Sequence, residues 1–297
     1  MLDGTFTALI TPFTADAEAV DYERLKTHIA GQAAGGVDGV VPCGTTGESP
    51  TLSHQEHRRV IEVAVEAAAG TGLKVLAGTG SNSTREALEL TRHAAEAGVD
   101  AALMVNPYYN KPDQEGLYRH FSTVADAVDL PIVLYNIPGR TGITMSVDTI
   151  ARLAEHRNIV AVKDATGSID MTSEVVARCG EGCRVFSGDD SLTLPMMSVG
   201  AVGVISVLSN LLPQRVKALQ AAAAAGHFAD ARAHHLGLFP LFRACLSMAV
   251  NPVTIKAAMR LAGHDSGALR LPLVPLEDAA TGQLRRLLQD AGVETAG

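Results

Sequence analysis

A lysine ends a run of small and β-branched apolar residues near the middle of the chain. Residues 158–163 read Asn-Ile-Val-Ala-Val-Lys, and Asp-Ala-Thr-Gly follows. Such a run is typical of a strand buried on both faces. Burial lowers the pKa of a lysine, and the neutral amine can attack a ketone to form a Schiff base. Lys163 is therefore a candidate nucleophile, and the alternative is a strand-end lysine whose ammonium reaches water.

Polar and glycine-rich segments follow other apolar runs. Gly-Thr-Thr-Gly at 44–47 offers N–H groups and hydroxyls that suit a carboxylate or phosphate, unless it is an ordinary turn. Tyr135 ends another run, and its phenol could relay protons to an imine, unless it is only a core tyrosine. Arg140 could clamp a carboxylate bidentately, unless it is an ordinary surface arginine.

Eight short apolar runs must position these groups. They span residues 6–10, 39–42, 75–78, 101–105, 132–135, 159–163, 184–187 and 202–207. Amphipathic segments between them predict helices, for example 55–69, 84–97, 116–127 and 147–155. This alternation predicts a parallel sheet, and eight units favour closure into a (β/α)₈ TIM barrel. An open doubly wound sheet is the competitor, but the first run leads into Thr-Pro-Phe and not into a glycine-rich turn.

Strands are no longer expected after about residue 213. Helices are predicted at 214–225, 228–247, 252–261 and 282–290, with no linker rich in Ser, Gly or charge. We therefore expect a (β/α)₈ catalytic domain over 1–225 and a C-terminal helical domain over 226–297, packed on the barrel. Because active sites of such barrels lie at the carboxyl ends of the strands, the candidate residues should meet at one rim.

Composition limits the partners and the compartment. The chain has 297 residues, 47 % of them apolar, and a formal net charge of −8 without a basic cluster, which argues against nucleic acid. No secretory signal or membrane-length apolar run is visible, so a cytoplasmic protein without membrane contact is expected. The four cysteines fit neither a zinc motif nor a disulfide framework, and free thiols are expected.

Four blocks carry a resemblance to a known family. They read Gly-Thr-Thr-Gly-Glu-Ser at 44–49, Tyr-Asn-Ile-Pro-Gly-Arg-Thr-Gly at 135–142, Lys-Asp-Ala-Thr-Gly at 163–167 and Ser-Gly-Asp-Asp at 187–190. In this order and spacing they resemble the dihydrodipicolinate synthase family. The wider family contains pyruvate-dependent class I aldolases such as N-acetylneuraminate lyase. The resemblance extends from residue 4 to about residue 272.

The resemblance implies a lyase that needs no metal or organic cofactor. Lys163 would form an imine with pyruvate, and the derived enamine would attack L-aspartate-4-semialdehyde. The product would be 4-hydroxy-tetrahydrodipicolinate, in the diaminopimelate route to lysine. Thr45, Tyr109 and Tyr135 match the family's proton relay, with Tyr109 reaching into a neighbouring subunit's site. A homotetramer made of two tight dimers is therefore implied.

Further positions match the family's substrate contacts. Thr46 would hold the carboxylate of pyruvate, and Arg140 would hold that of the semialdehyde. Gly188 and Ile205 would line the pyruvate pocket. The Pro-Gly-Arg-Thr-Gly segment at 138–142 is similar to the synthases and unlike the neuraminate lyases.

The helical tail departs from the family pattern. Residues 249–256 read Ala-Val-Asn-Pro-Val-Thr-Ile-Lys, whereas the family commonly shows Glu-x-Asn-Pro-x-Pro-Val-Lys. The missing glutamate and second proline are expected to lie away from the barrel rim and to leave the chemistry unchanged. Asp164 also replaces the commoner glutamate, which keeps the charge on a shorter side chain.

A second, allosteric site is implied by residues without a role in this chemistry. Lysine-inhibited members of the family bind lysine at positions that match Ser49, His54, His57, Asn82, Glu86 and Tyr108. Glu86 would meet the ammonium of lysine and Tyr108 its carboxylate. His54 and His57 are neighbours at a helix start, so a metal-binding pair and two solvated histidines are the alternatives.

Three other functions compete with this hypothesis. Another pyruvate aldolase or a sugar-acid dehydratase would share Lys163 and Tyr135, but Arg140 speaks against it. A non-catalytic ligand-binding barrel would be expected to have lost part of the site. A phosphate-handling isomerase needs an anion site after the last two strands, where Asp189 and Asp190 would repel anions.

Overall fold

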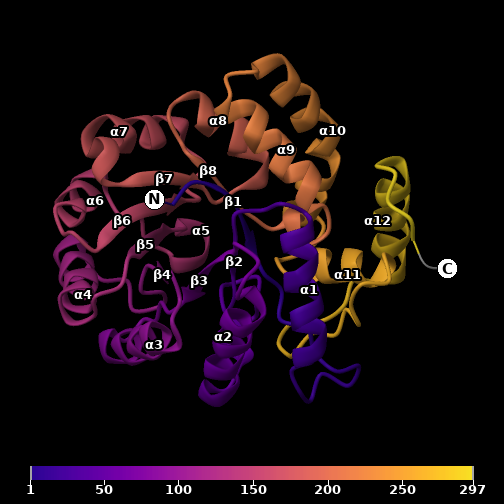
Figure 1. Cartoon of the computed structure of the whole chain (residues 1–297), viewed down its shortest axis with the longest axis horizontal. Helices are drawn as coiled ribbons and strands as arrows, with labels where there is room; N and C mark the ends of the chain where they lie inside the picture. The colour runs from indigo at the N-terminus through magenta and orange to yellow at the C-terminus, as the bar shows by residue number, and fades with distance from the viewer. Residues whose placement is uncertain (1, 296–297) are drawn as a thin grey trace.

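Eight parallel strands close into a barrel in the computed structural model, which describes residues 2–295 (Figure 1). The strands are β1 (Gly4–Ala8), β2 (Gly39–Val41), β3 (Lys74–Gly78), β4 (Ala101–Val105), β5 (Ile132–Asn136), β6 (Ile159–Asp164), β7 (Arg184–Ser187) and β8 (Gly203–Ser206). Each strand pairs with its neighbours along the chain, and β1 pairs with β8 to close the sheet. The predicted (β/α)₈ fold class is confirmed.

Helices surround the barrel and continue into a C-terminal extension. Those around the barrel are α1 (Tyr22–Ala34), α2 (His54–Ala68), α3 (Thr84–Ala97), α4 (Gln114–Ala127), α5 (Pro138–Thr141), α6 (Val147–Ala154), α7 (Ile169–Cys179) and α8 (Thr193–Ser198). The later ones are α9 (Pro213–Ala224), α10 (Phe228–Ser247), α11 (Val253–Leu261) and α12 (Asp278–Asp290). Serine or aspartate side chains cap most of the longer barrel helices by accepting a backbone N–H, as Ser53 does for α2.

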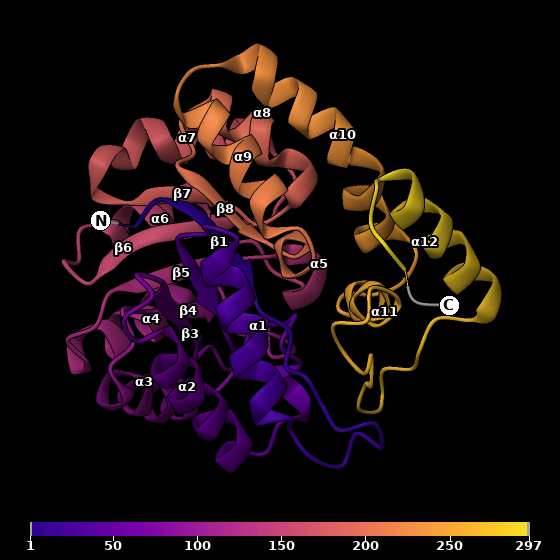
Figure 2. The same ribbon diagram turned by 45° about the vertical axis from the view of Figure 1, so that its right-hand side comes forward.

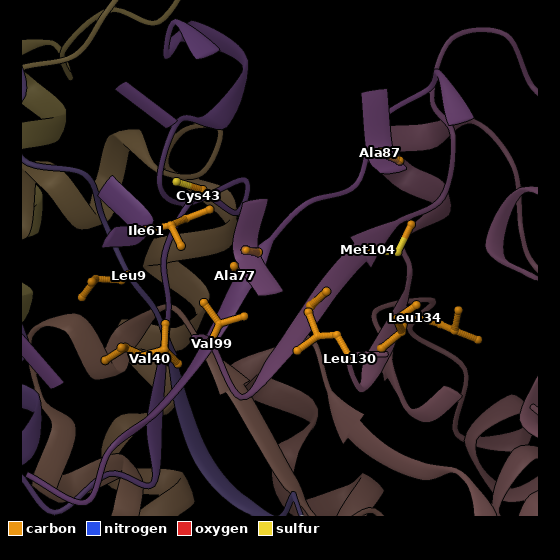
Figure 3. Close-up of a cluster of buried hydrophobic side chains, with 14 of the residues drawn as sticks. Leu9, Val40, Cys43, Ile61, Ala77, Ala87, Val99, Met104, Leu130 and Leu134 are labelled. Carbon is orange, nitrogen blue, oxygen red and sulfur yellow. The ribbon is translucent and has the colours of Figure 1, made fainter. Parts of the chain in front are cut away.

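Side-chain alternation divides the barrel into an inner and an outer core. Figure 3 shows part of the outer core, where strand residues such as Val40 and Leu134 belong to one cluster with helix residues such as Ile61. The inner core contains alternate strand residues, among them Phe186 and Ile205. On β6, Ala161 faces the inner core and Val162 the outer core. Lys163 therefore points into the barrel, at the carboxyl end of its strand.

The extension has its own hydrophobic cluster, which also includes barrel residues. Leu219 of α9, Phe242 of α10 and Ile255 of α11 pack together with Val204 of β8. Figure 2 shows α11 and α12 on the side of the molecule where α1 lies. The cluster includes α9, although the predicted division at residue 225 places this helix in the barrel. That division stays a prediction, and its outer limits, residues 1 and 297, lie outside the described residues.

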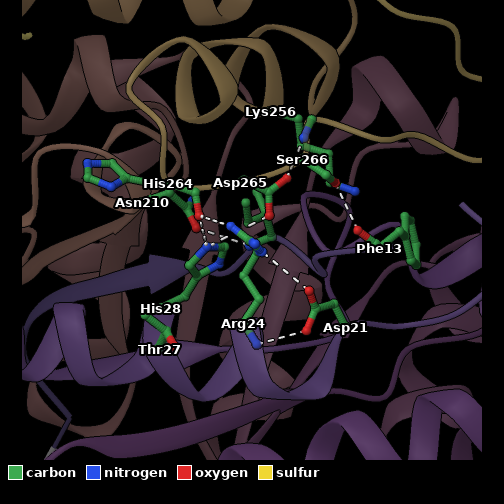
Figure 4. Close-up of polar contacts among 12 residues, drawn as sticks. Phe13, Asp21, Arg24, Thr27, His28, Asn210, Lys256, His264, Asp265 and Ser266 are labelled. Atoms are coloured by element: carbon green, nitrogen blue, oxygen red, sulfur yellow. Dashed lines mark hydrogen bonds and ion pairs between the residues drawn. The ribbon is translucent and has the colours of Figure 1, made fainter. Parts of the chain in front are cut away.

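Polar contacts fasten the extension to α1 and to the loop before it (Figure 4). The carbonyl of His264 accepts a hydrogen bond from Nη1 of Arg24 at 3.0 Å and lies 3.1 Å from Nε2 of His28. Oγ of Ser266 donates to the carbonyl of Phe13 at 2.8 Å. The extension is therefore held by polar contacts as well as by apolar packing.

Most element boundaries follow the predictions within one or two residues, and the first strand shows why they differ. It was predicted at 6–10 and spans 4–8. Leu9 and Ile10 are buried and apolar, but the backbone N–H of Ile10 donates to the side chain of Asn210, outside the ladder. An apolar run in the sequence therefore predicts which residues are buried. It does not predict where the strand ends, because backbone hydrogen bonding determines that position.

Two predictions from composition can be compared with the described residues. All four cysteines are free thiols, as expected. Within residues 2–295, no helix is long and apolar enough to cross a membrane.

Candidate active site

Lys163 and Tyr135 lie side by side at the carboxyl ends of β6 and β5. The two residues are paired in the strand register, and Nζ of Lys163 lies 4.2 Å from the centroid of the Tyr135 ring. Lys163 is 5 % exposed, so its amine does not reach open water. Burial lowers the pKa of Lys163 to about 8, although the nearby Asp190 acts in the opposite direction. A substantial fraction of the amine is therefore neutral near neutral pH.

Tyr135 presents a protonated phenol to this amine. Burial raises the pKa of Tyr135 to about 12, although Arg140 and a hydrogen bond with the Thr45 side chain act in the opposite direction. The phenol can therefore donate a proton or pass one on, with Thr45 as its partner.

The loop 44–48 follows β2 and has a backbone suited to an anion. Cys43 (φ 57°), which precedes the loop, and Glu48 (φ 52°), which ends it, adopt the left-handed conformation that non-glycine residues rarely take. Within residues 2–295, the backbone N–H groups of Thr45 and Thr46 donate to no protein acceptor. Thr46 is 3 % exposed, so a carboxylate bound there would be sheltered from water.

Gly188 leaves the space in which the Lys163 side chain lies. A Cβ at Gly188 would stand 2.8 Å from Cβ of Ala165 and 3.1 Å from Cε of Lys163. Its backbone N–H donates to the carbonyl of Asp164 at 2.7 Å, which fixes this close approach. Ile205 is 1 % exposed and belongs to the inner core. Both residues therefore border the barrel interior that contains Lys163.

Asp190 uses the backbone donors at the end of β8. Its Oδ2 accepts the N–H groups of Val207 and Leu208 at 2.9 and 3.0 Å. A phosphate at this position would need the same donors and would meet a buried carboxylate. The structure thus gives a second reason against a phosphate site after the last strands.

Arg140 and Tyr109 are the two exposed members of the predicted set. Nη2 of Arg140 donates to the backbone carbonyl of Asn251 at 3.1 Å, and its charge lowers the pKa values of Lys163 and Tyr135. Arg140 is therefore close to the buried side chains of Lys163 and Tyr135. Tyr109 is 89 % exposed and left-handed (φ 72°), and it is not brought into the site of its own chain.

A cavity of about 450 Å³ extends from part of the candidate active site to the predicted lysine-binding residues, although Lys163 and Thr46 do not line it. Thr45, Tyr135 and Arg140 line it. So do Ser49, His54, His57, Glu86 and Tyr108 of the second predicted site. Asn82 does not line this cavity. Its backbone carbonyl accepts a hydrogen bond from Nδ2 of Asn110 at 2.9 Å.

The predicted lysine-binding residues combine a carboxylate with a buried imidazole. Glu86 lies 2.9 Å from Nε2 of His54 and accepts a hydrogen bond from Ser81. His57 is 4 % exposed, and burial lowers its pKa to about 4, so its ring is neutral. The alternative of two solvated histidines is therefore wrong for His57. Within residues 2–295, no group of three or more His, Cys, Asp and Glu side chains could hold a metal.

The sequence reasoning missed the contribution of the tail. It considered only the altered positions, Ala249 and Thr254, and gave no role to Val250, Asn251 and Pro252 between them, which line the cavity. Lys256 forms a buried ion pair with Glu48 of the loop 44–48. No local signal identifies these contacts, because the partners are more than 200 positions apart in sequence.

The fold and the site together define a (β/α)₈-barrel lyase with a buried lysine at its rim. A sequence model of the dihydrodipicolinate synthetase family matches residues 1–291. The chain belongs to this family.

Similarity to individual proteins extends over nearly the whole chain. The 4-hydroxy-tetrahydrodipicolinate synthase of Geotalea daltonii is 51 % identical over 290 residues, which cover 98 % of this chain and 99 % of that protein. The dihydrodipicolinate synthase structure from Aquifex aeolicus matches with a TM-score of 0.97, 49 % identity and full coverage of both chains. The enzyme of Cyanidioschyzon merolae with lysine bound matches with a TM-score of 0.95 and 42 % identity, over 98 % of both chains.

Proposed function

We propose that Lys163 carries the condensation of pyruvate with L-aspartate-4-semialdehyde to 4-hydroxy-tetrahydrodipicolinate. The observation behind this proposal is a buried lysine with a pKa of about 8, paired with Tyr135 on the adjacent strand. The named relatives share the activity, and they match this chain over nearly its full length. The chain is therefore a lyase of lysine biosynthesis through diaminopimelate.

The reaction begins at the neutral amine of Lys163. The amine attacks the carbonyl carbon of pyruvate, and the resulting carbinolamine loses water to give a protonated imine. Loss of a methyl proton gives an enamine, whose carbon attacks the aldehyde of the semialdehyde while the aldehyde oxygen takes a proton. The α-amino group of the second substrate then attacks the imine carbon, which closes the ring and frees Lys163. Lys163 is the only protein group bonded to the substrate in these steps, and its protonated imine accepts the electrons that a cofactor would otherwise hold, so no cofactor is required.

Tyr135 and Thr45 move protons in these steps. The phenol of Tyr135 stays protonated at neutral pH, because burial raises its pKa to about 12. It can protonate the carbinolamine oxygen, which leaves as water. After the phenol has regained a proton, it can protonate the oxygen of the aldehyde. Tyr109 would complete the relay from a neighbouring subunit. Its exposure of 89 % leaves the ring available for such a contact. The homotetramer of two tight dimers is part of this proposal and follows from the family resemblance.

The carboxylates of the two substrates bind to separate groups. Thr46 holds the carboxylate of pyruvate through its hydroxyl and backbone N–H, and Gly188 and Ile205 border the pyruvate pocket. Arg140 binds the carboxylate of the semialdehyde bidentately. This second carboxylate separates the reaction from that of aldolases and dehydratases with polyhydroxylated substrates. We place the enzyme in the cytoplasm, where both substrates are expected.

The second function is feedback inhibition by lysine at the neighbouring residues. Glu86 supplies a carboxylate for an ammonium group, and the solved relative with lysine bound supports the choice of ligand. Ser49, His54, His57, Asn82 and Tyr108 complete this site. Millimolar L-lysine should lower the initial rate of the wild type and lower it less in Glu86→Gln. An unchanged wild-type rate would exclude inhibition.

The main proposal is tested by trapping the imine. The protein is treated with pyruvate and borohydride, its intact mass is measured, and turnover with aspartate semialdehyde is assayed separately. We expect a reduced pyruvyl adduct and turnover in the wild type, and neither in Lys163→Ala. An adduct without turnover would indicate another pyruvate aldolase. The absence of an adduct would exclude the Schiff-base mechanism and favour a non-catalytic barrel.

A further inference from the structure

Asn251 lies in the segment between α10 and α11 and contacts two of the proposed substrate-binding residues. Its Nδ2 donates a hydrogen bond to Oγ1 of Thr46 at 3.0 Å. Its backbone carbonyl accepts a hydrogen bond from Nη2 of Arg140 at 3.1 Å. Asn251 also lines the cavity that Arg140 lines. One residue of the extension therefore links the binding groups for the two substrate carboxylates.

The direction of the hydrogen bond from Asn251 determines what the hydroxyl of Thr46 can do. A hydroxyl has one proton and two lone pairs. Because Nδ2 of Asn251 donates to Oγ1, the bond uses a lone pair and leaves the proton available. That proton can then be donated to a carboxylate. An acceptor in place of Nδ2 would take the proton itself.

The position of Asn251 is secured by a second anchor on the same loop. Lys256 of α11 forms an ion pair with Glu48, two residues after Thr46, and both charged side chains are fully buried. The other carboxylate oxygen of Glu48 accepts the backbone N–H of Arg270 at 3.2 Å. The segment that carries Asn251 is therefore held against the loop 44–48 at two points.

We propose that Asn251 is a positioning residue for both substrates. It holds the hydroxyl of Thr46 as a donor to the carboxylate of pyruvate, and it fixes Arg140 for the carboxylate of the second substrate. The inference rests on the proposed function and adds to it a residue from outside the barrel strands. Asn251 acts through Thr46 and Arg140 and touches no reacting atom.

The test compares Asn251→Ala with Asn251→Asp by steady-state kinetics and by the pyruvate dependence of borohydride trapping. Loss of one hydrogen bond should raise the KM for pyruvate about two- to tenfold in Asn251→Ala, with kcat changed by less than about twofold. Asn251→Asp keeps the shape but replaces the donor with a charged acceptor. It should raise the KM further, because it takes the proton of Thr46 and repels the carboxylate of pyruvate.

A double-mutant cycle separates positioning from a general effect on the fold. In a Thr46→Val background the hydroxyl is absent, so the KM ratio caused by Asn251→Ala should fall to about one. Gln289→Ala removes an exposed amide from α12 of the same extension and should leave the KM unchanged. If Asn251→Ala gives no folded protein, Asn251→Ser replaces it in both comparisons.

The outcomes distinguish this inference from the proposed function. A wild type without imine trapping and turnover overturns both. An active wild type with an unchanged KM in Asn251→Ala and Asn251→Asp overturns only the inference. An undiminished effect in the Thr46→Val background also overturns it. A lower melting temperature of Asn251→Ala with an unaltered KM for pyruvate would likewise overturn the inference, because that combination indicates a purely structural role.

Discussion

Nζ of Lys163 lies 4.2 Å from the centroid of the Tyr135 ring because the two residues are register partners on adjacent strands. Hydrogen bonds of the sheet, and not a flexible loop, fix the distance between amine and phenol. Both side chains point into the barrel, where burial moves their pKa values apart, to about 8 for Lys163 and about 12 for Tyr135. The same burial therefore keeps the phenol protonated and makes the amine nucleophilic.

The rate of imine formation should follow the ionisation of Lys163. Below the pKa of about 8 the neutral fraction falls tenfold for each pH unit, so the rate should rise tenfold from pH 6 to 7 and level off above about pH 9. The measurement is the rate of borohydride-trapped adduct formation at saturating pyruvate between pH 6 and 10. A rate that still rises tenfold per pH unit up to pH 10, as for an ordinary lysine with a pKa of 10.5, would show that burial does not activate this amine.

Gly188→Ala should impair catalysis without unfolding the protein. The added methyl group would stand 2.8 Å from Cβ of Ala165 and 3.1 Å from Cε of Lys163, so the lysine must shift. A displacement of this kind should lower kcat/KM for pyruvate by about 100-fold. Gly31→Ala is the matched control, because a Cβ at this exposed position in α1 meets no atom within 4 Å. Equal activity of both variants would contradict the proposed packing against Lys163.

Tyr109 should act in the site of a partner subunit. Tyr109→Ala and Lys163→Ala should each be inactive alone, because every site in either homo-oligomer lacks one essential group. Mixed oligomers, purified with two different tags after co-expression, should regain activity. In such an oligomer one site combines an intact Lys163 with an intact Tyr109 of the neighbouring chain. Mixed oligomers that stay inactive would place Tyr109 in its own chain's site, and an active Tyr109→Ala homo-oligomer would place it outside catalysis.

Lys256→Met should destabilise the fold by about 3–5 kcal/mol, because it leaves the carboxylate of Glu48 buried without its partner. Urea unfolding with a two-state fit gives the free energy of unfolding. Glu48→Gln combined with Lys256→Met removes both charges and should be less destabilised than Lys256→Met alone. If Lys256→Met were as stable as the wild type, the ion pair between Glu48 and Lys256 would contribute little to the free energy of unfolding.

Much of the barrel site could be predicted because its signals are local. The apolar run before Lys163 indicates a buried strand, and burial is the main cause of the lowered pKa of Lys163. Tyr135 ends a similar run, so one rule places both residues at the same rim. The contacts of Asn251 could not be predicted in this way. They depend on how the extension folds back over the barrel, and no periodicity in residues 249–256 encodes that path.

The exposure of single residues also could not be predicted from the sequence. His54 and His57 are three positions apart on α2, yet only His57 is buried against the barrel. The helical period predicts that they are neighbours, but the packing of α2 decides which one loses contact with water. The same limit applies to Tyr109, which lies in a loop and is 89 % exposed.

The ion pair between Glu48 and Lys256 joins residues 208 positions apart. The substrate-binding loop therefore depends on residues that are synthesised much later. All eight strands have been made once residue 206 leaves the ribosome, but the anchors of the loop 44–48 have not. The nascent chain therefore contains Lys163 and all eight strands before it contains Asn251 and Lys256. The contacts that hold the loop 44–48 can form only after the tail has been synthesised.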